Sequence, residues 1–121
     1  AKYSLSIAAI LYRRGNIGGC RQYCNQTLKY QPSNGNAWLL IATCIARSAS
    51  GDALERSKYY CLAVDKCIRA KSVDPSCAAK ANRQIASYSA HFYPKSEAFF
   101  QGLQAGQTVT VMGESTTLRL R

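Results

Sequence analysis

The stretch Asp52–Pro75 reads DALERSKYYCLAVDKCIRAKSVDP and carries both a start signal and a stop signal for one long helix. Asp52 followed three residues later by Glu55 has the form of a capping box, in which the two side chains bind backbone N–H groups at the helix start. Asp74-Pro75 closes the stretch, because proline cannot continue a helix. Apolar and small residues recur between them at three- and four-residue spacing, which predicts a helix over 53–72.

The same spacing extends in both directions, almost without interruption from Leu5 to Phe92. Gly15 and the pair Gly18-Gly19 interrupt it first, and the segment Gln31–Gly35 interrupts it again. These breaks divide the pattern into segments of ordinary helix length. We therefore predict four further helices, near 2–14, 18–30, 36–48 and 76–92.

The pattern changes after Pro94. Ser96–Leu103 predicts one short helix, and beyond it the apolar spacing becomes two, at Val109, Val111, Leu118 and Leu120. This alternation predicts a β-hairpin with a turn at Met112–Ser115, whose apolar face should dock on the helices because an isolated hairpin is marginal in water. The expected fold is all-α, with a helical repeat region at 1–106 and a carboxyl-terminal hairpin at 107–121 packed on the same domain.

Two prolines suggest internal repeats. Pro32 and Pro75 each follow the second helix of a predicted pair, as in arrays of antiparallel helix pairs. Small or short side chains, which let paired helices approach closely, stand in the same order before each proline: Ala8, Gly15, Cys20 and Thr27, then Ala42, Ala49, Ala63 and Ala70. The prolines are 43 residues apart, against about 34 for a common repeat of this kind. We expect the insertion within Ser48–Tyr60.

With these features the chain resembles the tetratricopeptide-repeat (TPR) family. Residues 1–34 resemble one repeat, 35–77 a second with an enlarged turn, and 78–93 the first helix of a third. Four residues follow the family pattern, namely Trp38, Ala42, Ala63 and Pro75. Three positions depart from it, Ser4, Cys24 and Cys67. The resemblance implies a non-catalytic scaffold for protein–protein interaction.

A second resemblance spans roughly residues 20–121. The segments 63–66, 71–75, 88–94 and 97–103, with the closing hairpin, resemble the carboxyl-terminal region of exported repeat proteins of Bacteroidales, a group of undefined function. That implies the cell envelope or periplasm of a Gram-negative bacterium, with a natural carboxyl terminus at Arg121. Because the opening at Ala1 looks like the middle of a helical domain, we expect the signal segment and any earlier repeats to lie outside this chain. The sequence contains no run of about 18 apolar residues, so it does not predict a transmembrane segment.

In TPR proteins the first helix of each pair lines a concave groove, and side chains not used for packing face it. Carried over to this chain, the resemblance assigns ten residues to the groove: Lys2, Tyr12, Arg13, Asn36, Leu39, Thr43, Arg47, Lys80, Arg83 and Ser87. Their basic and polar character favours an acidic peptide or protein partner. The Lys and Asn pair of the family's chaperone-tail clamp is replaced by Leu5 and Ala9, so we expect no chaperone binding.

The charge balance leaves one alternative. Sixteen Lys and Arg against six Asp and Glu give a net charge of +10, but no basic run is longer than two residues. This dispersion favours solvated helix faces over a nucleic-acid stripe. Eight tyrosines beside this charge nevertheless keep single-stranded nucleic-acid or polyanion binding as the alternative function.

The sequence does not predict catalysis, a cofactor or a metal site. His91 is the only imidazole, and no acid stands in the same stretch to orient it, so we read it as a helix-end residue in a protein that is not an enzyme. Of the six cysteines none forms a Cys-x-x-Cys pair. Cys20, Cys24 and Cys67 fall on the packing side of their helices, which favours buried free thiols. If a disulfide exists, the pair to test is Cys24 with Cys44, from neighbouring helices.

Overall fold

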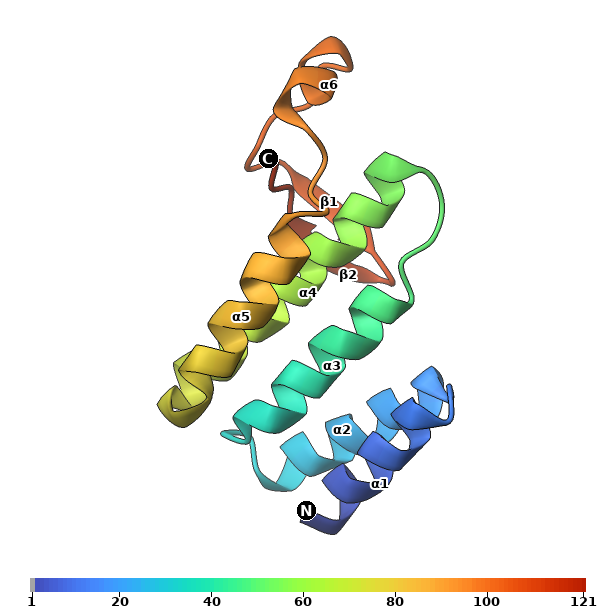
Figure 1. Cartoon of the computed structure of the whole chain (residues 1–121), viewed down its shortest axis with the longest axis vertical. Helices are drawn as coiled ribbons and strands as arrows, with labels where there is room; N and C mark the ends of the chain where they lie inside the picture. Colours follow the sequence, from blue (N-terminus) through green and yellow to red (C-terminus); the bar gives the residue numbers. More distant parts are fainter. Residues whose placement is uncertain (1) are drawn as a thin grey trace.

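The computed structural model describes residues 2–121, with side chains from Ser4 onward. Helices dominate it, with one short hairpin near the carboxyl end (Figure 1). The helices are α1 (Lys2–Arg13), α2 (Ile17–Tyr30), α3 (Gly35–Arg47), α4 (Ala53–Val73), α5 (Ala78–Ser89) and α6 (Lys95–Phe100). The 3-10 turn η1 (Pro75–Cys77) joins α4 to α5, and β1 (Thr108–Val111) pairs antiparallel with β2 (Glu114–Thr117).

Each of the first four helices packs against the next one along the chain, and the hairpin packs against α4. In Figure 1, α1, α3 and α5 form the nearer layer, with α2 and α4 behind them. The predicted helical character and the five long helices are therefore confirmed.

Side-chain caps fix where three helices begin. The side chain of Asn16 accepts a hydrogen bond from the Gly19 amide at 2.9 Å, and that of Asn34 accepts one from the Ala37 amide at 3.1 Å. Asp52 caps α4 in the same way, accepting from the Glu55 amide at 2.9 Å. These bonds satisfy amides that have no partner within the helix.

Small side chains fill the places where α1, α2, α3 and α4 pack together. Eight of them are fully buried: Ala8, Cys20, Cys24, Ala42, Cys44, Ala63, Cys67 and Ala70. Because none is larger than a cysteine, the helix backbones can approach closely. Larger apolar side chains such as Leu39, Ile45 and Leu62 close the core around them.

The apolar face of the hairpin docks on the helices, as expected. Val111 is buried in the main core between the helices. Leu118 is buried, and Val109 and Leu120 are half-buried, in a second apolar cluster with Cys61, Val64 and Phe92. The Asp65 carboxylate on α4 accepts hydrogen bonds from Thr116 at 2.5 Å and from the Arg119 guanidinium at 2.6 Å. The hairpin is thus held to α4 by both apolar and charged contacts.

Two predicted boundaries near the carboxyl end are wrong. Helix α5 ends at Ser89, before the expected residue 92, because the chain turns inward and the Tyr93 amide donates to the Ser57 hydroxyl at 2.8 Å. The hairpin turn contains only Met112 and Gly113, both at positive φ, so β2 spans 114–117. Consequently Leu118 and Leu120 lie beyond the strand, and Leu120 instead forms a parallel bridge with Tyr93.

The prediction of an enlarged turn between the third and fourth helices is also wrong. Between α3 and α4 only residues 48–52 are outside the two helices, and α4 is 21 residues long against 13 for α3. The added residues therefore lengthen α4. Its first turns are stabilised by the segment after α5, through the buried Ser57 hydroxyl.

Replacing Gly35 by alanine should destabilise the fold. A Cβ atom there would lie 2.5 Å from the Cys77 sulfur and 2.8 Å from Cβ of Asp74. We expect Gly35→Ala to lower the free energy of unfolding by about 1–3 kcal/mol, as overpacking does. Gly18→Ala is the matched control, because no atom lies within 4 Å of its added Cβ. In urea unfolding, equal stability of the two variants would contradict the close approach.

Replacing Asp65 by asparagine should weaken the docking of the hairpin. The substitution keeps the shape but removes the charge that binds Arg119, and hydrogen bonds to charged groups are worth about 1.5–3 kcal/mol. We expect Asp65→Asn to lower the free energy of unfolding by about 1–2 kcal/mol. Glu55→Gln is the control, because the exposed Glu55–Lys58 pair should contribute about 0.5 kcal/mol or less. Equal losses in thermal unfolding would argue against the Asp65 link.

Candidate partner-binding groove

A cavity of about 220 Å³ opens between α1, α3 and α5. Its lining comes from all three helices: Leu5 and Ala9 from α1, Asn36, Leu39, Leu40 and Thr43 from α3, and Lys80 and Gln84 from α5. On each helix these residues are spaced three or four apart, except that Leu39 and Leu40 are adjacent. This spacing places them on one face of the helix. Three separate segments of sequence thus meet at one site.

The cavity has an apolar floor and a polar rim. Leu39 is buried at the bottom, with Leu5 and Leu40 half-buried beside it. Asn36 and Lys80 are exposed at its edge. An apolar floor with a few polar groups around it is the usual composition of a recognition site.

A hydrogen-bond network centred on Thr43 fixes one end of the cavity. The Thr43 hydroxyl donates to the Leu39 carbonyl at 3.0 Å and accepts from the Gln84 amide at 3.2 Å and from the Tyr88 hydroxyl at 3.4 Å. Burial raises the pKa of Tyr88, so its hydroxyl stays protonated and able to donate at neutral pH. Because Gln84 and Tyr88 both lie on α5, the network holds α5 against α3.

The structure brings four of the ten predicted groove residues to this cavity: Asn36, Leu39, Thr43 and Lys80. Tyr12 and Arg47 meet each other instead, with the guanidinium carbon 5.2 Å from the ring centre, a cation–π contact between the ends of α1 and α3. Arg13, Arg83 and Ser87 are exposed on α1 and α5 outside the lining. The side chain of Lys2 lies outside the described residues.

Two lining residues, Leu40 and Gln84, were not predicted as groove residues, and Leu5 and Ala9 were named only as replacements for the chaperone clamp. The signal for Gln84 was its position four residues after Lys80, on the same face of the helix. Leu40 has the same kind of signal, four residues after Asn36 and three before Thr43, but its apolar side chain fits the buried face of α3 as well as the groove.

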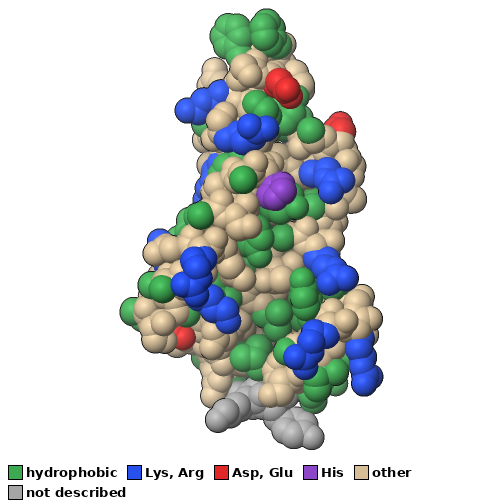
Figure 2. Space-filling view, in the orientation of Figure 1, with side chains coloured by type: hydrophobic (Ala, Val, Ile, Leu, Met, Phe, Trp, Pro, Cys, Tyr) green, Lys and Arg blue, Asp and Glu red, His purple; other side chains and the backbone are tan. Residues whose placement is uncertain are grey.

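Figure 2 shows the face formed by α1, α3 and α5. Apolar side chains form an irregular stripe along its middle, with Lys and Arg scattered on both sides and few acidic groups. This distribution surrounds the apolar cavity with positive charge.

No protein-family model, curated protein or solved structure matches the chain. Across the described residues, no helix is long and apolar enough to cross a membrane, and no three His, Cys, Asp or Glu side chains gather as metal ligands.

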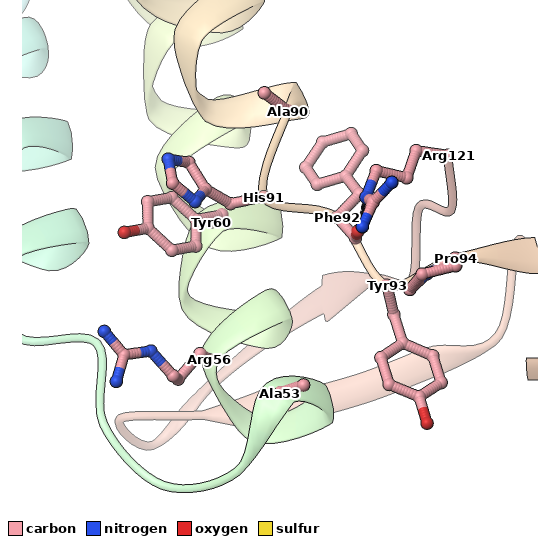
Figure 3. Close-up of a pocket in the computed structure, with 9 residues that line it drawn as sticks. All are labelled: Ala53, Arg56, Tyr60, Ala90, His91, Phe92, Tyr93, Pro94 and Arg121. Carbon is pink, nitrogen blue, oxygen red and sulfur yellow. Dashed lines mark hydrogen bonds between the residues drawn. The ribbon is translucent and has the colours of Figure 1, made fainter. Parts of the chain in front are cut away.

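A second cavity, of about 280 Å³, lies between the start of α4 and the segment after α5 (Figure 3). Arg56 and Arg121 stand on opposite sides of it, and the His91 ring stacks on Tyr60 with 4.3 Å between ring centres. The Arg121 side chain donates to the Phe92 carbonyl at 2.8 Å. None of the nine lining residues is an acid, serine or cysteine, so the cavity provides no carboxylate to orient His91 as a base.

Proposed function

We propose that this chain is a non-catalytic scaffold that binds an acidic peptide or protein segment in the groove between α1, α3 and α5. The observation that carries the proposal is the cavity in which Asn36, Leu39, Thr43 and Lys80 come together with the apolar side chains of α1. The TPR resemblance assigns these same four residues to a groove.

The helix arrangement supports a TPR-like array. The pairs α1/α2 and α3/α4 each pack together, α5 follows against α4, and the first helices of the pairs share one layer (Figure 1). Side chains no larger than cysteine stand where the paired helices cross. In such arrays the layer of first helices carries the extended binding surface.

The charge and the floor together define the ligand. Lys80 at the rim, with the exposed Arg13 and Arg83 on the same layer, favours carboxylate groups, which guanidinium groups can bind through two parallel hydrogen bonds. The apolar floor favours at least one apolar side chain between those carboxylates. We therefore propose a segment in which acidic and large apolar residues alternate.

Three of the tyrosines give less support to nucleic-acid binding, whereas Tyr30 is exposed. Tyr12 lies under Arg47, and Tyr60 stacks on His91 with Tyr88 beside it. Base stacking needs exposed ring faces, and these three rings are half-buried with their faces in contact with other side chains. Binding of a nucleic acid or another polyanion is therefore the alternative that the experiment below also tests.

Reversing charge on the groove layer should weaken binding of an acidic peptide. The probe is a short fluorescent peptide in which Glu and Leu alternate, measured by fluorescence anisotropy. For the triple variant Arg13→Glu, Lys80→Glu and Arg83→Glu we expect at least about tenfold weaker binding, because each lost exposed pair contributes up to about 1 kcal/mol. Arg47 is left unchanged because it packs on Tyr12.

The control triple is Lys29→Glu, Arg56→Glu and Lys95→Glu, which changes the net charge equally at exposed positions outside the α1, α3 and α5 helices. We expect it to weaken binding no more than about threefold. Equal loss in both triples, or equal affinity for a thymidine oligonucleotide, would mean that general positive charge attracts the ligand and that no groove is used. Helicity and melting temperature should be similar in both.

Filling the cavity without changing its charge should also weaken binding of the acidic peptide. Ala9 lines the cavity from α1, so Ala9→Phe should occupy the space meant for an apolar ligand side chain and weaken binding about fivefold or more. Ile10→Phe is the control, since Ile10 is exposed on the same helix outside the lining. If Ala9→Phe binds the peptide as well as Ile10→Phe does, the cavity is not the site.

A further inference from the structure

Three fully buried thiols meet between α2 and α3. Cys20 and Cys24 lie on α2, one turn apart, and Cys44 lies on α3. The sulfur of Cys44 is 3.1 Å from the sulfur of Cys20. The sequence favoured free thiols and named Cys24 with Cys44 as the pair to test, whereas the structure brings Cys20 next to Cys44.

The short distance between these two sulfur atoms means that a disulfide could form between them with little movement. Two sulfur atoms in a disulfide are about 2.05 Å apart, so closing the 3.1 Å gap needs a movement of about 1 Å. The two thiols come from different helices and approach each other. Cys20 and Cys24 lie on the same side of one helix, and their side chains cannot converge in this way.

We propose that Cys20 and Cys44 are a site of oxidative modification and form a disulfide that joins α2 to α3. The co-reactant is a disulfide-bearing oxidant, either oxidised glutathione or the active-site disulfide of a thiol oxidoreductase. The inference does not depend on the proposed peptide-binding function.

The reaction proceeds by two exchanges. The thiolate of one cysteine attacks the oxidant's disulfide, which forms a mixed disulfide and releases one thiol of the oxidant. The thiolate of the second cysteine then attacks the cysteine sulfur of that mixed disulfide and releases the second thiol. The two cysteines together lose two protons and two electrons, and the oxidant's disulfide is reduced to two thiols.

The surroundings determine when this reaction can occur. Burial, together with the neighbouring Cys20 thiol, raises the pKa of Cys44 to about 12, and burial raises the pKa of Cys24 as well. Since the thiolate is the reactive form and all three thiols are fully buried, out of reach of an oxidant, the folded and reduced protein reacts slowly. The bridge therefore forms while the chain folds, before α2 and α3 close over the thiols, and once formed it is shielded from reductants.

The bridge should stabilise the helix array. It closes a loop of about 25 residues, and cross-links of this size constrain the unfolded chain enough to stabilise small proteins measurably. For a chain of this length that corresponds to a rise in melting temperature of roughly 10 °C.

The experiment is refolding of the full chain from denaturant in a glutathione redox buffer, followed by alkylation under denaturing, non-reducing conditions and peptide mapping by mass spectrometry. We expect a linked pair of peptides containing Cys20 and Cys44, with Cys24 alkylated. The refolded protein should melt roughly 10 °C higher without reductant than after reduction under denaturing conditions and refolding in reductant.

Two variants make the result specific. Cys24→Ala should keep the linked pair and the difference in melting temperature, whereas Cys44→Ala should lose both and leave Cys20 free for alkylation. Complete alkylation of all six cysteines in the refolded wild-type chain would overturn the proposal. A link between Cys24 and Cys44 would overturn it as well, because the bridge would then not follow from the Cys20–Cys44 contact.

Discussion

The close approach of α2, α3 and α4 is the constraint on which the rest of this structure depends. It requires side chains no larger than cysteine where these helices meet, and Cys24, Ala42, Ala63 and Cys67 meet that requirement while fully buried. Larger residues there would push the helices apart and leave voids that a chain of 121 residues has little further core to offset. Because α3 packs closely on both α2 and α4, these contacts also position the layer of α1, α3 and α5.

The same close approach determines how the helix ends are satisfied. At the start of α3, Gly35 comes so near to η1 that its amide donates to the Asp74 carboxylate at 3.2 Å. Asp74 also accepts from the Ser76 amide, so one side chain joins the start of α3 to the turn after α4. The Asp-Pro stop that ends the longest helix in the sequence therefore also fixes the start of its partner helix, α3. The hydrogen bonds from the Ser76 hydroxyl and from the Gly35 and Ser76 amides lower the pKa of this carboxyl. Their contribution to stability is therefore present above the carboxyl's unfolded pKa and is lost as the pH falls through its lower folded pKa.

Local signals predicted much of this fold, and tertiary contacts account for what they missed. The helix starts at Asn34 and Asp52 and the stop at Pro75 depend on residues close in sequence, so they could be read directly. The end of α5 depends on the Ser57 hydroxyl, 36 residues before Tyr93, and no local pattern encodes that bond. The two-residue turn at Met112-Gly113 places methionine at positive φ, a choice that turn preferences disfavour. Of the ten residues that the TPR resemblance assigns to a groove, four line one cavity, because helical spacing gives the face of each helix and not which faces meet.

Residues 43 and 44 of α3 show how the front and the back of the molecule are joined. Thr43 points toward α5 and accepts hydrogen bonds from Gln84 and Tyr88, while the next side chain, Cys44, contacts Cys20 of α2. One turn of α3 therefore contacts one helix in each layer, α5 and α2. Because the cavity is lined from α1, α3 and α5, and α1 packs mainly on α2, the width of the cavity follows from where this turn places α2 and α5. The buried thiols and the cavity therefore lie on two sides of the same helix, α3.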